Sequence, residues 1–330
     1  MALTPQATPE ISVVIPTFNR AAMLRKAITS ALAQRDVAIE VVVSDNCSND
    51  DTAAVVAEFA DDARLVYHRN TSNLGMVGNW RQAIFELARA DWFVLMSDDD
   101  WFIDDSYLAR AAAAIRQHAP KFVYAGGHID NITTGERRTL RLPFDGLVPG
   151  EAVLASRGTV QPQDITLCNM VFNRRDAARL GFLDDPDNLS CDSALYLRLC
   201  CEGPVFAVPD PVSVYLVHGN NLFERIQRQH QLLDKNLDYL ALPYAHALAL
   251  GVSTEALQAF RRNARLDPHV AKTLLRLRLH DEAWYQACRQ RLQRLIPGVL
   301  REVESTWGYR LKWLSYRLAR ERYRRRYPLA

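Results

Sequence analysis

The chain has 330 residues, of which 48% are apolar, so it can form one large core with a smaller satellite or two domains of ordinary size. This composition excludes an intrinsically disordered protein. The 40 basic and 38 acidic residues leave a net charge of +2, so the overall charge does not indicate nucleic acid as a partner.

The cysteines and the apolar stretches indicate the compartment. Six cysteines without C-x-x-C spacing argue against a zinc knuckle or a redox pair and fit reduced thiols in a cytosolic protein. The first ten residues, MALTPQATPE, lack the basic and apolar regions of an export signal. The apolar stretch LALPYAHALALGV is broken by Pro243 and is shorter than the ~18 to 20 residues of a membrane span. We therefore expect a cytoplasmic protein with no membrane-spanning helix.

The first hundred residues predict alternating strands and helices. Short apolar, β-branched runs predict strands at 11–16, 39–44, 64–68 and 92–97. Apolar residues at helical spacing predict helices within 24–32, 49–60 and 77–90, and Asn19 can cap the first of them. This order predicts an α/β fold with a mostly parallel sheet, on which ligands bind beyond the carboxyl ends of the strands.

Polar segments follow the predicted strands, and the one after the fourth strand contains Asp98, Asp99 and Asp100 in a row. One such residue could simply cap the next helix. Three adjacent carboxylates raise one another's pKa unless a cation intervenes, so a hard divalent ion is the natural occupant. Magnesium or manganese held by one or two carboxylates usually completes its shell with substrate phosphates. The segment therefore predicts a metal and nucleoside diphosphate site.

The chain changes character near residue 220. From about Leu222 the pattern is helical almost throughout, which places a domain boundary near 220. Residues 301–330 contain nine basic and three acidic residues. Trp307, Leu311, Leu314 and Leu318 recur there at helical spacing. This pattern fits a helix on an anionic membrane surface, and equally an ordinary packed helix with a solvated basic face.

Four segments carry a resemblance to a known family. The motifs ISVVIPTFNR, VVVSDNCSNDDT, RNTSNLGMVGNW and FVLMSDDDW, in this order and spacing, resemble the nucleotide-sugar-binding half of glycosyltransferase family 2, whose fold is called GT-A. The resemblance covers about residues 11–220. Within the family, the motifs are most similar to abequosyltransferase-like members that decorate bacterial surface polysaccharides.

The resemblance implies a role for each motif. The segment from Pro16 to Arg20 would line the nucleotide, Asp45 would read its base, and further residues would lie beside the donor or hold the metal. Asp45, Asn73 and Gly75 are also ordinary turn residues. The implied set is Pro16, Thr17, Asn19, Arg20, Asp45, Asn73, Gly75, Asn79, Asp98 and Asp99 for the nucleotide-sugar, with Asp100 and His218 as ligands of Mn²⁺ or Mg²⁺.

The resemblance also implies a catalytic base. NMVFNRRDAARLGFLDD followed by SCDSALYLRLCCEG resembles the family stretch that ends in a Glu-Asp pair, and Asp192 aligns with the general base. Inverting transfer needs a carboxylate that takes the proton of the acceptor hydroxyl. Cys191 stands where the family usually has Glu, which leaves that role to one residue. Asp192 could instead complement a helix dipole, with Asp184, Asp185 or Asp187 as the base.

These patterns lead to one expectation for the whole chain. A tail at 1–10 precedes a GT-A (Rossmann-like) domain at 11–220, with helices on both faces of its sheet, and an all-helical region at 221–330 with a basic amphipathic tail at about 301–330. The expected function is metal-dependent, inverting transfer of one sugar from a nucleoside diphosphate donor to a hydroxyl of a glycan or lipid-linked glycan acceptor. Bacterial O-antigen or capsule biosynthesis is the expected setting.

Three alternatives remain beside it. A sugar-1-phosphate nucleotidyltransferase uses a similar sheet and magnesium, but its Gly-rich N-terminal signature is missing after ISVVIP. A processive polysaccharide synthase would carry a Gln-x-x-Arg-Trp motif, which this sequence lacks. A non-catalytic protein could bind membranes through the basic tail.

Overall fold

The computed structural model describes residues 8–156, 166–187, 190–218, 235–266, 268–318, 321–322 and 325. The chain forms two compact units. The first, which we call the sheet unit, comprises Met1–Val148, Asp164–Pro186 and Pro204–His218. The second, the helical unit, comprises Pro149–Gln163, Asp187–Gly203 and Gly219–Ala330. The boundary predicted near residue 220 lies in 219–234, outside the described residues, and stays a prediction.

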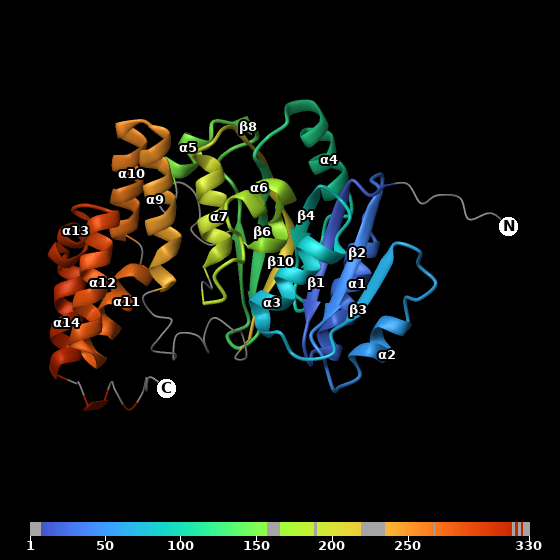
Figure 1. Ribbon diagram of the computed structural model, residues 1–330, viewed down its shortest axis with the longest axis horizontal. Helices are drawn as coiled ribbons and strands as arrows, with labels where there is room; N and C mark the ends of the chain where they lie inside the picture. Colours follow the sequence, from blue (N-terminus) through green and yellow to red (C-terminus); the bar gives the residue numbers. More distant parts are fainter. Residues whose placement is uncertain are drawn as a thin grey trace. The chain divides into compact units, whose positions relative to one another are not determined.

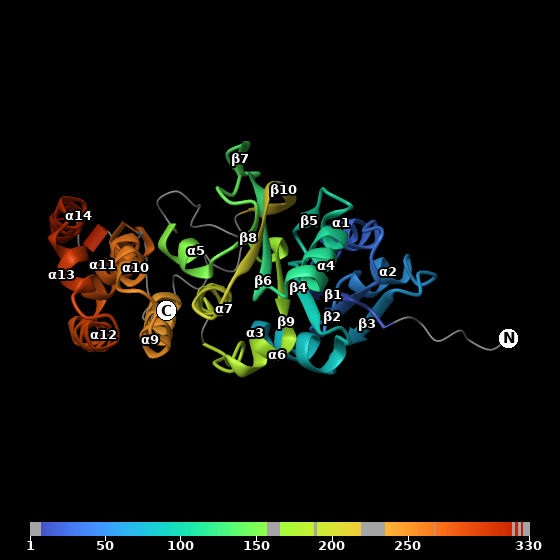
Figure 2. The same cartoon turned by 90° about the horizontal axis from the view of Figure 1, so that it is seen from above.

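The sheet unit confirms the predicted α/β fold. Its strands are hydrogen-bonded in the order β3-β2-β1-β4-β9-β6-β10-β5, with β7 paired to β6 and β8 to β10 (Figure 1 and, for β5, β7 and β9, Figure 2). The pairs β1–β2, β2–β3, β1–β4 and β6–β10 are parallel, whereas β9 is antiparallel to both β4 and β6. The strands are β1 (Ile11–Thr17), β2 (Ile39–Asp45), β3 (Leu65–Arg69), β4 (Trp92–Leu95), β5 (Trp101–Phe102), β6 (Phe122–Asn131), β7 (Glu136–Leu140), β8 (Gly146–Val148), β9 (Met170–Asn173) and β10 (Val205–Val217).

Helices cover both faces of this sheet. Helices α1 and α4 lie on one face, and α3, η1 and α6 lie on the other (Figure 2). Every residue of β1 and β2 is buried, which explains their continuous apolar runs. Leu24 and Ile28 of α1 pack with Ile15 of β1 in the main core. The helical elements are α1 (Ala21–Leu32), α2 (Thr52–Ala57), α3 (Gly75–Gln82), the π-helical η1 (Ala83–Leu87), α4 (Tyr107–His118), the 3₁₀ turn η2 (Leu167–Asn169) and α6 (Arg174–Arg179).

The start of α1 differs from the sequence-based prediction. Asn19 does not cap this helix: it has a left-handed backbone with φ of 55°, and Arg20 is the N-cap residue. The Asn19 side chain instead accepts a hydrogen bond from the backbone N of Asn49 at 2.8 Å. Asp50 Oδ2 accepts from the backbone N of Ala21 at 3.0 Å and so satisfies the helix terminus from a distant loop.

In the part that the structure describes, the chain beyond residue 234 is helical, as the sequence predicts. Helix α14 contacts α11 and α13, while α5 contacts α10 and α7 contacts α9. None of the helices in the described ranges is both long and apolar enough to cross a bilayer. The helical unit contains α5 (Gly150–Ser156), α7 (Cys191–Cys200), η4 (Lys235–Leu237), α9 (Asp238–Leu250), α10 (Thr254–Leu266), α11 (Pro268–His280), α12 (Glu282–Leu295), α13 (Val299–Ser305) and α14 (Trp307–Leu318).

Candidate active site

Asp98, Asp99 and Asp100 lie in the turn between β4 and β5, beyond the carboxyl end of β4. We call these three residues the aspartate cluster. All three are buried, with exposed fractions of 5%, 6% and 2%. Carboxylates that merely cap a helix stay in contact with water, so this burial requires partners within the site.

Thr17, the last residue of β1, and Arg20, which follows the strand, supply the first partners of the cluster. Thr17 Oγ1 donates a hydrogen bond to Asp98 Oδ2 at 2.7 Å. The Arg20 guanidinium bridges two carboxylates, at 3.2 Å from Asp98 Oδ1 and 2.5 Å from Asp99 Oδ2. The structure thus brings together four residues that the sequence assigned to the nucleotide-sugar site.

The end of β10 supplies the next partners. His218 Nε2 lies 2.8 Å from Asp99 Oδ2, and both side chains are buried. The backbone N of Leu216 donates to Asp100 Oδ1 at 3.1 Å. His218, predicted as a metal ligand, therefore contacts the aspartate cluster although it lies more than a hundred residues away along the chain.

Burial shifts the pKa of two carboxyl groups of this cluster, those of Asp98 and Asp100. It raises the pKa of Asp98 to about 6, although the charge of Arg20 opposes the shift. Burial also raises the pKa of Asp100 well above its ordinary value, and the negative charge of Asp99 adds to the effect. Because like charges so close together disfavour ionisation, an added cation would stabilise the ionised form of the cluster.

The donor set is suited to a hard divalent cation. Asp99 and Asp100 offer oxygen ligands and His218 offers an imidazole nitrogen, all of which Mn²⁺ accepts. Within the described residues, no group of three or more His, Cys, Asp or Glu side chains is arranged to hold a metal ion. An ion that takes one or two ligands from the protein, and completes its shell with phosphate oxygens and water, would match the chemistry of these side chains.

Asp45, predicted to read the base, ends β2 and is fully buried. Its Oδ1 accepts from the backbone N of Ser48 at 2.8 Å, and its Oδ2 accepts from Tyr67 Oη at 2.8 Å. Arg69 Nε lies 3.7 Å from the same Oδ2. The carboxylate therefore already has several partners in the protein, and its role toward a base stays a prediction.

Asn79, predicted to lie near the donor, takes part in a buried amide network. Its Oδ1 accepts from Ser44 Oγ at 2.7 Å and Asn70 Nδ2 at 3.0 Å, and its Nδ2 donates to the Ser44 carbonyl at 3.0 Å. Asn46 extends the network, because its Oδ1 accepts from Asn70 Nδ2 at 3.3 Å and from the backbone N of Leu74 at 2.8 Å. Sequence reasoning missed Asn46 and Asn70, although each directly follows a strand, where such partners are expected.

Asn73 and Gly75 form the turn into α3. Asn73 Oδ1 accepts from the backbone N of Gly75 at 2.8 Å and from Asn46 Nδ2 at 3.0 Å. Gly75 has a φ of +73°, which favours glycine there. Pro16, the remaining predicted residue of this edge, lies in β1 opposite Ser44 of β2. A turn explains Asn73 and Gly75 structurally, and their contact with a donor stays a prediction.

The predicted base, Asp192, belongs to the helical unit, whereas the residues described above belong to the sheet unit. Asp192 is in the first turn of α7, which belongs to the helical unit, and its Oδ1 accepts from the backbone N of Ser193 at 2.7 Å. Asp184, one of the alternatives, forms an exposed ion pair with Arg81 at 2.7 Å. The role of Asp192 stays a prediction.

Comparison with known proteins identifies similar chains. A model of a family described as "Glycosyl transferase family 2" matches residues 12–181. The "PGL/p-HBAD biosynthesis glycosyltransferase" of Mycobacterium bovis is 30% identical over 181 residues, which is 51% of this chain and 70% of that protein. The "GalNAc(5)-diNAcBac-PP-undecaprenol beta-1,3-glucosyltransferase" of Campylobacter jejuni is 37% identical over 113 residues, 34% of this chain and 35% of that one.

A solved structure has the same fold at low sequence identity. The mannosyltransferase PcManGT from Pyrobaculum calidifontis, in complex with GDP-Man and Mn²⁺, superposes with a TM-score of 0.53 at 19% identity. The match covers 96% of this chain and 87% of that one. This similarity confirms the GT-A-like α/β fold with a helical C-terminal region.

Proposed function

The chain belongs to glycosyl transferase family 2 and is a glycosyltransferase, and on this premise we propose the reaction that its site performs. One sugar moves from a nucleoside diphosphate sugar to a hydroxyl of a glycan or lipid-linked glycan, with inversion at the anomeric carbon. A divalent cation, Mn²⁺ or Mg²⁺, assists. The aspartate cluster with Arg20 and His218 carries this proposal, because buried carboxylates beyond the strand ends fit a cation that binds a diphosphate.

Each side chain has a proposed task. Asp100 and His218 would hold the cation, which compensates the charge of the departing diphosphate. Asp99 would face the sugar or diphosphate, and Asp98 the ribose or base. Thr17 Oγ1 and Arg20 keep Asp98 in a fixed orientation, which is how a preorganised site lowers the cost of binding.

Asp192 would act as the base. Its carboxylate would take the proton of the acceptor hydroxyl while that oxygen attacks the anomeric carbon from the side opposite the diphosphate. Asp192 lies in the first turn of α7, where a carboxylate is compatible with the helix dipole.

The finer assignment is also part of the proposal. We place the enzyme among abequosyltransferase-like proteins of bacterial O-antigen or capsule synthesis, on the cytoplasmic side of the membrane. The Campylobacter relative, whose name includes a PP-undecaprenol acceptor, supports a lipid-linked substrate. The PcManGT complex with GDP-Man and Mn²⁺ supports a nucleotide-sugar and a metal. The basic residues in 301–330 would keep the enzyme at an anionic membrane surface.

The metal and the donor can be tested together. Release of nucleoside diphosphate from UDP-, GDP-, dTDP- and CDP-sugars is measured with Mn²⁺ and with EDTA. We expect one donor to be turned over only with metal, and Asp100→Ala to lose that turnover by at least about a hundredfold, the cost of removing one electrostatic partner. The matched control is Asp105→Ala, since Asp105 lies in the same stretch and pairs with Arg35 at the surface. Full turnover by Asp100→Ala would refute the metal role.

The base has a separate test. Asp192→Asn should leave donor binding nearly unchanged and reduce transfer by about a hundredfold to ten-thousandfold, the usual contribution of a general base. Asp210→Asn is the control, because that carboxylate lies in an exposed ion pair with Arg141 and has no proposed role in transfer. NMR of the product determines whether the anomeric configuration inverts. Retention of configuration, or unimpaired transfer by Asp192→Asn, would overturn this assignment.

A further inference from the structure

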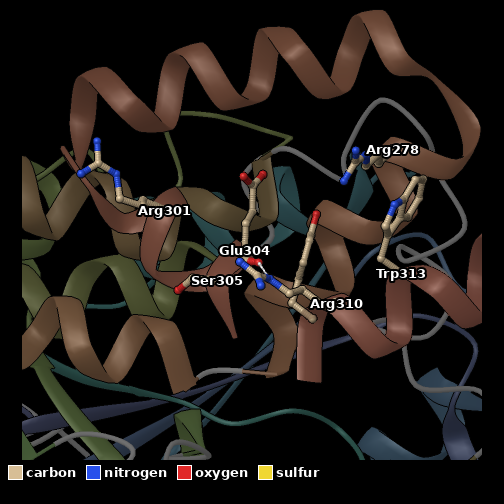
Figure 3. Close-up of a pocket in the computed structure, with 7 residues that line it drawn as sticks. Arg278, Arg301, Glu304, Ser305, Arg310 and Trp313 are labelled. Atoms are coloured by element: carbon tan, nitrogen blue, oxygen red, sulfur yellow. Dashed lines mark hydrogen bonds between the residues drawn. The ribbon is translucent and has the colours of Figure 1, made fainter. Parts of the chain in front are cut away.

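The helical unit contains a cavity lined by arginines, which no part of the proposed transfer reaction uses. It has a volume of about 420 Å³ and lies among α11, α13 and α14 (Figure 3). Arg278, Arg301 and Arg310 line it together with Glu304, Ser305, Tyr309 and Trp313. All of these residues belong to the helical unit, so the cavity is defined within one compact body.

The cavity has an excess of positive charge. Its carboxylate, that of Glu304, already accepts hydrogen bonds from Tyr285 Oη at 2.6 Å and Arg289 Nη2 at 3.0 Å. Arg301 and Arg310 form no ion pair with any carboxylate in the described part of the chain. Guanidinium groups bind phosphate through two parallel N–H donors, so such a cavity favours a phosphate group.

Arg278 is fixed for such a contact. Its guanidinium carbon lies 4.1 Å from the centre of the Trp313 ring and 5.4 Å from that of Tyr285. Stacking on two rings holds the planar group in place while its edge donors can reach a ligand. Figure 3 shows Arg278 beside Trp313 at one side of the cavity and Arg301 at the other.

The opposite side of α14 presents an apolar stripe to solvent. Tyr309 faces the protein and is buried. The stripe consists of Trp307, Leu311, Leu314 and Leu318, at spacings of four, three and four residues, with exposed fractions of 77%, 60%, 52% and 81%. Large apolar side chains that are exposed together on one helix face mark a contact with a membrane or another protein.

We propose that α14 and this cavity form a docking site for an anionic phospholipid surface. The arginines would bind lipid phosphates, and the stripe would enter the boundary between head groups and acyl chains, where Trp is favoured. Arg310 joins the two parts, since it lines the cavity and lies one turn from Trp307 and next to Leu311. This inference rests on the membrane contact in the proposed function and not on the transfer reaction.

Charge favours a lipid surface over a second copy of the chain. Arg310, Lys312 and Arg317 are exposed on the same helix as the stripe. A symmetric contact between two copies would bring these like charges together, which disfavours association. An anionic lipid surface complements the same charges and attracts them.

Sedimentation with vesicles tests the inference on the full chain. We expect binding to phosphatidylcholine vesicles that contain phosphatidylglycerol, weaker binding at high salt, and little binding to pure phosphatidylcholine. Arg301→Gln/Arg310→Gln and Leu311→Ser/Leu314→Ser should each weaken binding at least tenfold. Brominated lipid should quench tryptophan fluorescence, and Trp307→Phe should reduce that quenching.

The control is Arg262→Gln/Arg294→Gln, which changes the net charge by the same amount at exposed residues that do not line the cavity. Equal losses in the control and the cavity variant would show that net charge alone drives binding and would overturn the site. Unchanged vesicle binding by both the arginine and the leucine variants would also overturn the site. So would a wild-type protein that does not bind vesicles but forms a dimer which Leu311→Ser/Leu314→Ser dissociates. Far-ultraviolet circular dichroism checks that each variant is folded. A chain that transfers sugar to a soluble acceptor but does not bind vesicles would refute the docking site and the proposed membrane contact, and would leave the proposed transfer reaction standing.

Discussion

Two buried carboxyl groups of the sheet unit have opposite pKa shifts. Burial would raise the pKa of Glu40, but hydrogen bonds from Ser12 Oγ and the backbone N of Arg89, both at 2.6 Å, outweigh it and lower that pKa. At Asp98, burial prevails over Arg20 and Thr17, and the pKa rises to about 6. The geometry of nearby donors therefore decides which buried carboxyl group is ionised.

Glu40→Gln should destabilise the protein in a pH-dependent way. Because the pKa of Glu40 is lower in the folded than in the unfolded chain, this group stabilises the fold above its ordinary pKa of 4.5. That stability is lost as the pH falls through the folded pKa. We expect the variant to be less stable by about 2 kcal/mol at pH 7, as for a hydrogen-bonded charge, with a smaller difference in acid. Urea denaturation across this range measures the difference, and a loss independent of pH would contradict the explanation.

Asp98→Asn should have the opposite pH dependence. The pKa of Asp98 is higher in the folded chain, so the folded state retains its proton between the ordinary value of 3.8 and about 6. The wild type then loses stability as the pH rises through this window, and Asn does not titrate. In EDTA, we expect the variant to gain up to about 3 kcal/mol relative to wild type, since one pKa unit corresponds to about 1.4 kcal/mol. The exposed Asp105→Asn is the control and should show no such gain.

At the scale of elements, α1 depends on a residue that lies beyond the next strand. Asp50 Oδ2 accepts from the backbone N of Ala21 at 3.0 Å, while Asp50 Oδ1 accepts from Thr52 Oγ1 at 2.5 Å. One carboxylate therefore ties the first turn of α1 to the start of α2. Both helices begin at the edge of the sheet where the aspartate cluster lies, so this tie also supports the site.

Asp50→Ala should cost about 1 kcal/mol or slightly more, the usual loss when a helix cap is removed. The matched control is Asp51→Ala, because Asp51 is the N-cap residue of α2 yet its side chain makes no capping hydrogen bond. Chemical denaturation of both variants measures the difference. Equal stability of the two variants would show that Asp50 does not cap α1.

The four strands β1 to β4 and their order along the chain could be predicted, because buried parallel strands such as ISVVIP and IEVVVS have continuous apolar runs. The meeting of Thr17 with Asp98 follows from the rule that parallel strands end at one edge. Local patterns could not show that Asp50 rather than Asn19 caps α1, since two distant segments meet there. Local sequence patterns also could not show that Arg20 bridges two carboxylates, or that Ser44 and Asn70 donate hydrogen bonds to the side-chain oxygen of Asn79.

At the scale of the whole molecule, the two units are assembled from interleaved segments. Pro149–Gln163 and Asp187–Gly203 precede the last strand of the sheet unit in sequence but belong to the helical unit. Within the helical unit, α5 contacts α10 and α7 contacts α9. The composition along the chain cannot reveal that these segments belong to the helical unit, because short amphipathic helices have similar sequence patterns whichever unit they pack in.

Binding of donor and metal should stabilise the folded protein as a whole. A ligand at 100 times its dissociation constant adds about 2.7 kcal/mol, and 1 kcal/mol shifts the melting temperature of a domain of this size by about 2–4 °C. We therefore expect the matching nucleoside diphosphate with Mn²⁺ to raise the first melting transition by about 5–10 °C in differential scanning calorimetry. EDTA or Asp100→Asn should remove most of the shift, while Asp105→Asn should keep it. If UDP, GDP, dTDP and CDP all leave the transition unchanged, or if Asp100→Asn responds as wild type does, the aspartate cluster does not bind a metal with a diphosphate.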